Sequence, residues 1–185
     1  GEGFEVGHAG LRPHIAFRSS YNHHYAPAAC AGASVMVCSN GEMHGDFMVV
    51  LRKQTTYVLN DLDRLVSDGV GQIEQAFGHA CHVADDLMSV PLTLDEGYEM
   101  LGLALGHGVV TPTVANVAFK DWTNPRHEDF SERNMWSFKN CLTEGAKKAS
   151  AGSQIDLLTG ISAFMKKHSP SLGSDIYSTS SLAVY

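Results

Sequence analysis

The chain has 185 residues, of which 44% are hydrophobic and 18% charged, and its formal net charge is −7. This is the composition of a globular domain with a real core, not of a disordered chain. No apolar run approaches the ~18 residues that a membrane helix needs, so no membrane partner is expected. Four scattered cysteines without a CxxC pair favour a reduced, cytoplasmic protein over a disulfide scaffold.

The first third of the chain predicts strands. Residues 11–19 alternate between apolar and polar side chains, which indicates a half-buried strand. Residues 31–38 form a small-residue strand, and residues 46–52 form a returning one. Between them, Ser39-Asn40-Gly41 predicts a tight hairpin, because Asn-Gly readily adopts the positive φ of such turns. We therefore expect a small antiparallel sheet.

The rest of the chain predicts helices. Apolar residues at three- and four-residue steps predict one long amphipathic helix over residues 58–77. Thr93-Leu94-Asp95-Glu96 is a capping box that opens a second helix, which ends at Gly106-His107-Gly108. Residues 109–127 contain two prolines and are expected to be irregular.

Two more helices follow toward the C-terminus. Ser131 is expected to cap a helix that runs to Lys148, and Ser153-Gln154-Ile155-Asp156 to cap another. The predicted fold class is α+β, a small antiparallel sheet with an Asn-Gly hairpin packed by about four helices. Residues 1–168 would form this single domain, and residues 169–185 a Ser/Gly-rich tail. Because the chain starts at Gly1 and not at Met, a leading segment is expected to be missing.

The negative charge is concentrated in one stretch. Residues 61–100 carry nine acidic residues and one basic residue, whereas the other 145 residues carry 12 bases and 11 acids. Such a stretch is usually a solvated helix face, but it would also suit a basic protein partner. A protein-interaction module, such as an inhibitor of a host factor, is therefore one alternative function.

Histidines and cysteines raise a second alternative, a metal-dependent enzyme. His79-Ala80-Cys81-His82 and His23-His24 are the tightest clusters, but neither has the spacing of a known zinc site. Cys38 beside His44 would be a candidate thiol, although a cysteine in an apolar strand usually belongs to the core. Phosphate-binding and nucleophile motifs are missing from the sequence. We therefore predict no cofactor, no metal and no enzymatic activity.

Cations and aromatic residues cluster as a single-strand nucleic-acid groove requires. One cluster contains Arg12, Arg18, Tyr21 and Tyr25, and continues to Arg52 and Lys53 at the end of the hairpin. The other contains Trp122 and Arg126. In this hypothesis the basic residues neutralise phosphates, and Tyr21, Tyr25 and Trp122 stack on bases.

Several segments together resemble the phage/plasmid-like domain family of unknown function. They are Ser19-Ser20-Tyr21-Asn22, residues 35–41 with Cys38-Ser39-Asn40-Gly41, residues 51–55, and residues 136–147 with Trp136, Asn140, Thr143 and Lys147. Relatives often carry Arg two residues before the Val-Cys pair, where this chain has Val35. The resemblance spans about residues 11–165.

The resemblance implies an origin in a mobile element. By analogy, phages related to coliphage N-four use a single-stranded-DNA-binding cofactor that brings the phage RNA polymerase to melted promoters. The expected function is therefore largely sequence-independent binding of single-stranded DNA in viral transcription or replication. Expected partners are single-stranded DNA, a phage RNA polymerase and a second copy of the chain.

Overall fold

Three antiparallel strands in the N-terminal part of the chain form the sheet on which the fold is built. The computed structural model describes residues 10–18, 26–38, 40–50 and 58–169. Within these residues, β1 (Leu11–Arg18), β2 (Ala28–Val35) and β3 (Gly41–Val50) pair in the order β1-β2-β3. Helices make up most of the rest, so the predicted α+β class and the predicted small sheet are confirmed. Of the expected tail at residues 169–185, the structure describes Ser169, which is buried, and residues 170–185 lie outside the described residues.

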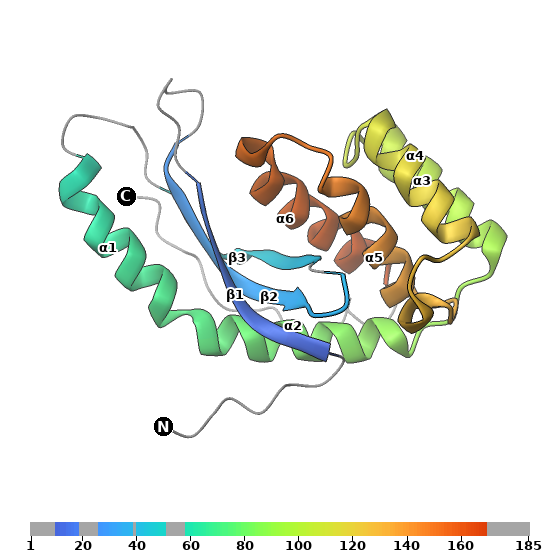
Figure 1. Cartoon of the computed structure of the whole chain (residues 1–185), viewed down its shortest axis with the longest axis horizontal. Helices are drawn as coiled ribbons and strands as arrows, with labels where there is room; N and C mark the ends of the chain where they lie inside the picture. The colour runs from blue at the N-terminus through green and yellow to red at the C-terminus, as the bar shows by residue number, and fades with distance from the viewer. Residues whose placement is uncertain (1–9, 19–25, 39, 51–57, 170–185) are drawn as a thin grey trace.

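Helices cover both faces of this sheet, as Figure 1 shows. All eight residues of the central strand β2 are buried, and seven of them are Ala, Gly, Cys or Ser. Such short side chains let the helices on either side come close to the strand. Ala29 and Ala31 face α1 and α2, whereas Cys30 packs on Ile155 of α6.

The β2–β3 hairpin differs from the predicted tight Asn-Gly turn. The backbone N–H of Val35 donates to the oxygen of Asn40 (2.8 Å), so the loop lies between these two residues and Gly41 already begins β3. Among the described residues, the glycines with positive φ are Gly10 and Gly108. Asn40 is buried at the base of the hairpin, where α5 holds its side chain.

The long helix expected over residues 58–77 is two helices, α1 (Val58–Gly71) and α2 (Ile73–Met88), and α2 extends further than predicted. They meet at Gln72, beside Gly69 and Gly71. Glycine is a poor helix former, which favours an interruption here. Gly69 also lies against Ile15 and Ala29 of the sheet.

Beyond α2, helix α3 (Leu94–Gly106) begins with the predicted capping box. Thr93 Oγ1 accepts from the backbone N–H of Glu96, and the Glu96 carboxylate accepts from that of Thr93. Gly108 (φ +69°) lies just after the helix, as the sequence predicts for its end.

The prediction of an irregular segment over residues 109–127 is wrong for most of that range, because helix α4 (Pro112–Thr123) occupies it. Thr111 caps this helix by accepting from the N–H of Val114 (3.4 Å). Proline at the first helical position lacks an N–H that would be unpaired there anyway. Pro112 therefore starts a helix and does not break one.

The last helices are α5 (Met135–Ala146) and α6 (Ala151–His168), after a short 3-10 turn, Glu128–Phe130. Asn134, not the predicted Ser131, caps α5 by accepting from the N–H of Ser137 (2.9 Å). Ser153 lies inside α6, which begins before it. Ile161, Phe164 and Met165 on α6 are buried in the core.

We expect Gly97→Ala to destabilise the fold by about 1–3 kcal/mol, although Ala is the better helix former. A Cβ at Gly97 would lie 2.0 Å from Nε1 of the buried Trp122, whose indole donates to the Leu94 oxygen (3.0 Å). Thermal unfolding would measure the loss. Gly78→Ala is the matched control: nothing lies within 4 Å of its Cβ position, so stability should not fall. Equal stability of the two variants would contradict the proposed clash.

Across the described residues, none of the helices has the length and apolarity needed to cross a bilayer.

Candidate nucleic-acid interface

Half of the residues predicted to contact nucleic acid lie outside the described part of the chain. Tyr21 and Tyr25 belong to the segment between β1 and β2, and Arg52 and Lys53 to the segment between β3 and α1. Their roles stay predictions. The remaining four, on β1, on α4 and in the segment after α4, have described positions.

The two arginines of β1 differ in accessibility. Arg12 is exposed. Arg18 has a side chain only 8% exposed, and its guanidinium forms an ion pair with Asp156 of α6 (2.5 Å) and donates to the Ala26 oxygen (3.2 Å). This burial contradicts the expected phosphate role of Arg18, which instead joins β1 to α6.

Trp122 is a core residue and not a stacking platform. Its side chain is 1% exposed and meets Phe138 edge to face, with ring centroids 5.5 Å apart. The guanidinium of Arg133 lies over its ring at 4.9 Å. No face of the indole is open to a base, so the predicted stacking role is wrong.

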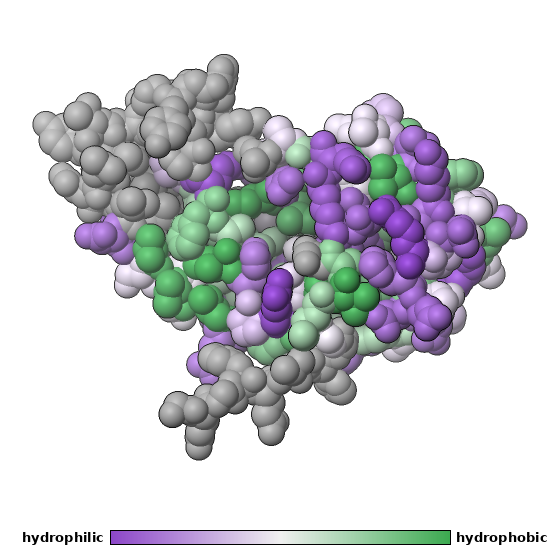
Figure 2. All heavy atoms as spheres, viewed as in Figure 1, coloured by the Kyte–Doolittle hydropathy of each residue, from purple (hydrophilic) through white to green (hydrophobic). Residues whose placement is uncertain are grey.

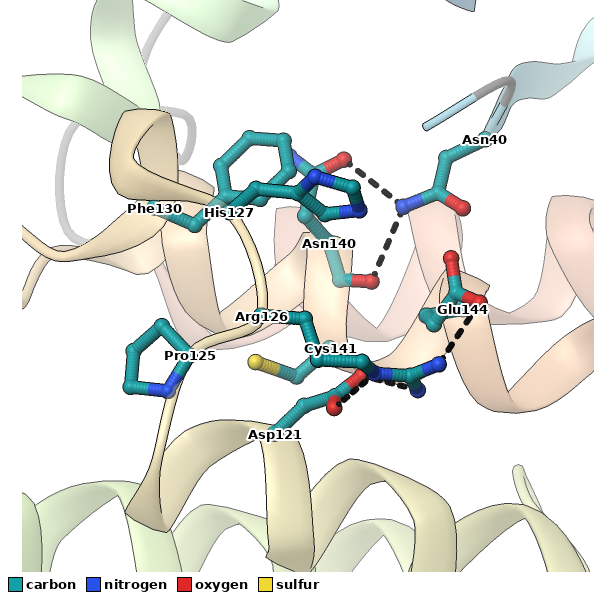
Figure 3. A pocket seen from close by; sticks show the side chains of 9 residues that line it. All are labelled: Asn40, Asp121, Pro125, Arg126, His127, Phe130, Asn140, Cys141 and Glu144. Atoms are coloured by element: carbon teal, nitrogen blue, oxygen red, sulfur yellow. Dashed lines mark hydrogen bonds and ion pairs between the residues drawn. The ribbon is translucent and has the colours of Figure 1, made fainter. Parts of the chain in front are cut away.

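Arg126 is exposed, but two carboxylates offset its charge. It donates to both oxygens of Asp121 (2.6 and 2.7 Å) and forms an ion pair with Glu144 (3.5 Å), as Figure 3 shows. The hydrogen bonds that Asp121 accepts from Arg126 raise the pKa of Arg126 above its ordinary value. A phosphate at this position would have to compete with both carboxylates.

The same figure shows the small pocket in which two motif segments, residues 35–41 and 136–147, meet. Asn40 Nδ2 donates to the backbone oxygen and to Oδ1 of Asn140 (3.1 Å each). Asn40 Oδ1 is turned away from Asn140 and has no partner among the described residues. With a volume of about 10 Å³, the pocket has room for about one water molecule.

Two lysines complete this junction: Lys139 of α5, and Lys147 directly after that helix. Lys147 donates to the backbone oxygen of Cys38 and to Glu144 (2.5 Å). Lys139 forms a fully buried ion pair with Glu42 of β3. These contacts attach the hairpin to α5, and Asn40, Lys139 and Asn140 are too enclosed to form an open binding surface.

The described cysteines and histidines do not form a reactive thiol site or a metal site. Burial raises the pKa of Cys38, and raises that of Cys141 to about 12, so both are protonated at neutral pH and are poor nucleophiles. Within the described residues, His, Cys, Asp and Glu do not gather in groups of three or more that would hold a metal. His23 and His24 lie outside those residues.

An open groove of about 260 Å³ lies between the sheet, α5 and α6. Its polar lining consists of His14, Ser34, Thr143, Lys147 and Gln154. Ala16, Met43, Ile155 and Leu158 form an apolar base, and Phe17, half exposed, lies at the edge strand β1. Among the described residues, no Asp or Glu lines this groove.

The groove combines a neutral histidine with a partly exposed cation. Burial, and then the positive charge of Arg12, lower the pKa of His14, so its imidazole is neutral at pH 7 and can both donate and accept hydrogen bonds. The Lys147 side chain is 37% exposed. Hydrophobic residues gather over the strands and α1 in Figure 2, whereas hydrophilic ones cover much of α3 to α6.

The sequence predicted Arg12, which lies beside this groove, as a nucleic-acid contact, but it predicted none of the residues that line the groove. Phe17 falls on the apolar side of an alternating strand, and its exposure follows from the edge position of β1, which the alternation does not reveal. Lys147 was noted only within a family motif. The available signal was the presence of a cation, Arg12, and an aromatic residue, Phe17, on the same predicted strand.

Comparisons of the chain with protein-family models, curated proteins and solved structures find no match in any of the three. The resemblance to the phage/plasmid-like family therefore stays a hypothesis.

Proposed function

We propose that this chain binds single-stranded DNA in the groove between the sheet and helices α5 and α6. One observation carries the proposal: a groove without a carboxylate in its described lining lies beside the exposed Arg12 and the half-exposed Phe17 of β1. Single-strand binders combine cations that follow the backbone with aromatic faces on which bases stack.

The size of the groove favours part of a polymer as its ligand. Pockets for complete small molecules usually measure about 300–1,000 Å³, and this one is smaller. It suits one unpaired base that meets the hydrogen-bonding groups of His14, Ser34 or Thr143, while a neighbouring base stacks on Phe17 at the edge of β1. A base within a duplex is stacked and paired, so it presents neither its face nor these edges.

The proposal describes a binding protein and not an enzyme. If the resemblance to a mobile-element family holds, the setting would be viral transcription or replication in the cytoplasm of a host cell. A phage RNA polymerase would then be the partner. These wider roles rest on the resemblance alone.

The acidic stretch gives less support to the alternative of a protein-interaction module. Its residues lie on α1, α2 and α3, and α1 and α3 are at opposite ends of the molecule in Figure 1. The stretch is therefore not one continuous face. None of the acidic residues of this stretch lines the groove, which is consistent with a DNA-binding role for the sheet, α5 and α6.

A charge reversal tests the proposal. Fluorescence anisotropy with labelled single-stranded and duplex oligonucleotides of equal length, at low and moderate salt, should show micromolar or tighter binding that favours the single strand. Arg12→Glu should weaken this binding about tenfold and flatten its salt dependence, since a phosphate contact is lost. Arg64→Glu, an equal charge change at an exposed position on α1, is the control and should have little effect.

Two results would refute the groove. One is the absence of binding by the wild-type chain at low salt. The other is an equal loss of affinity in Arg12→Glu and Arg64→Glu, which would mean that only the overall charge matters.

A further inference from the structure

Helices α3 and α4 form an antiparallel pair whose outer side carries an apolar groove of about 420 Å³. Tyr98, Leu101, Gly102 and Leu105 line it from α3, and Pro112, Ala115, Asn116 and Phe119 line it from α4. Figure 1 shows this pair at the end of the molecule away from α1. This groove shares no lining residue with the proposed DNA site.

The spacing of the lining residues is the same on both helices. Each contributes the first, fourth, fifth and eighth position of an eight-residue span, which is the stripe of an amphipathic helix that packs on another helix. The stripe is partly open to solvent, because Leu105 is 40% exposed and Phe119 47% exposed. Two parallel apolar stripes on antiparallel helices are half of a four-helix bundle.

The contacts of Tyr98 fix which ends of the two helices lie together. Its ring stacks on Phe119 with centroids 5.1 Å apart, and its hydroxyl bonds Thr123 Oγ1 (3.0 Å). The beginning of α3 therefore lies beside the end of α4. A second copy turned about a two-fold axis parallel to the helices would lay its α3 antiparallel on α4 of the first copy, with these ends still matched.

Charges beside the stripes complement each other in that arrangement. Glu99 adjoins Gly102 on the surface of α3, and Lys120 adjoins Asn116 on α4, by the three- and four-residue neighbour rule. Both are exposed, and neither forms an ion pair within the described residues. The two-fold axis brings Glu99 of one copy next to Lys120 of the other, twice.

We propose that the α3–α4 groove is a homodimer interface, in which two copies of the chain form a four-helix bundle. Phe119 and Leu105 would be its apolar centre, and Glu99 and Lys120 would set its orientation. A dimer would place two DNA grooves in one particle, one at each side of the bundle.

Sedimentation equilibrium of the full chain tests the interface. The wild-type chain should show a mass twice that of one chain, and Phe119→Asp should raise the dimer dissociation constant at least about 100-fold, because it buries a carboxylate among apolar groups. Leu103→Asp is the control: Leu103 is 45% exposed on α3 but outside the groove, so its dimer should persist. Circular dichroism would verify that both variants are folded.

A charge swap tests the orientation. Glu99→Lys alone and Lys120→Glu alone should each weaken the dimer about tenfold, since both symmetric pairs become repulsive. The double variant Glu99→Lys with Lys120→Glu should restore the wild-type constant. A wild-type chain that stays monomeric at ~100 µM would overturn the proposal, as would a dimer that Phe119→Asp leaves intact. A double variant no better than the single ones would overturn the orientation.

Discussion

Lys139→Met is expected to lower the free energy of unfolding by about 3–5 kcal/mol, because it leaves the Glu42 carboxylate without its ion-pair partner in the interior. The Lys139 and Glu42 side chains are 1% and 3% exposed, so water cannot replace the lost contact. The pair joins β3 to α5 at the junction where the hairpin meets the helices. Urea denaturation at neutral pH would measure the loss.

Two further variants separate the burial of charge from the loss of a side chain. Lys148→Met, at an exposed position soon after α5, should change stability by less than about 0.5 kcal/mol. Lys139→Met combined with Glu42→Leu should recover part of the stability, since an apolar pair leaves no charge in the interior. A loss below about 1 kcal/mol in Lys139→Met would show that water reaches Glu42.

Phe17→Ala is expected to weaken binding of single-stranded DNA by about 5- to 150-fold, the effect of losing one stacked base. The ring is 50% exposed at the edge strand β1, so its removal should cost the fold little. Combining Phe17→Ala with Arg12→Ala should give a larger loss and a flatter salt dependence. Phe17→Tyr, which keeps an aromatic face, should bind almost as the wild type does.

The control for this prediction is Leu103→Ala, which removes an equally exposed apolar side chain from a helix remote from the groove. Its DNA affinity should not change. If Phe17→Ala binds single strands as tightly as Leu103→Ala does, the described groove does not stack bases. The aromatic residues at positions 21 and 25 would then be the next candidates.

The elements that the sequence predicted well are those with strictly local signals. The alternation in residues 11–19 needs only the two-residue period of a strand, and the capping box at Thr93 closes within four residues. Pro112 misled the prediction because proline ends helices as well as starting them. Thr111 directly before it was the local signal for a start.

The site was harder to predict because its parts are distant in sequence. Whether Phe17 is open or covered depends on β1 being an edge strand, and whether Arg18 is free depends on α6 reaching it. Trp122 looked like a stacking residue because irregular segments expose aromatic rings, whereas the helix that it occupies turns the indole into the core. The packing of segments that are distant in sequence determines the exposure of Phe17, Arg18 and Trp122. A single sequence does not show directly which segments pack together.

The junction between Asn40 and Asn140 has a consequence for synthesis of the chain. The two residues are 100 positions apart, and a ribosome that adds about 5–20 residues per second needs about 5–20 s to make that interval. During this time one face of the nascent sheet lacks the helices that cover it, and its alanine-rich central strand is still accessible. Newly made copies on neighbouring ribosomes can pair through the edge strands of such an incomplete sheet, β1 and β3. Chaperone binding at this stage would therefore favour the native product.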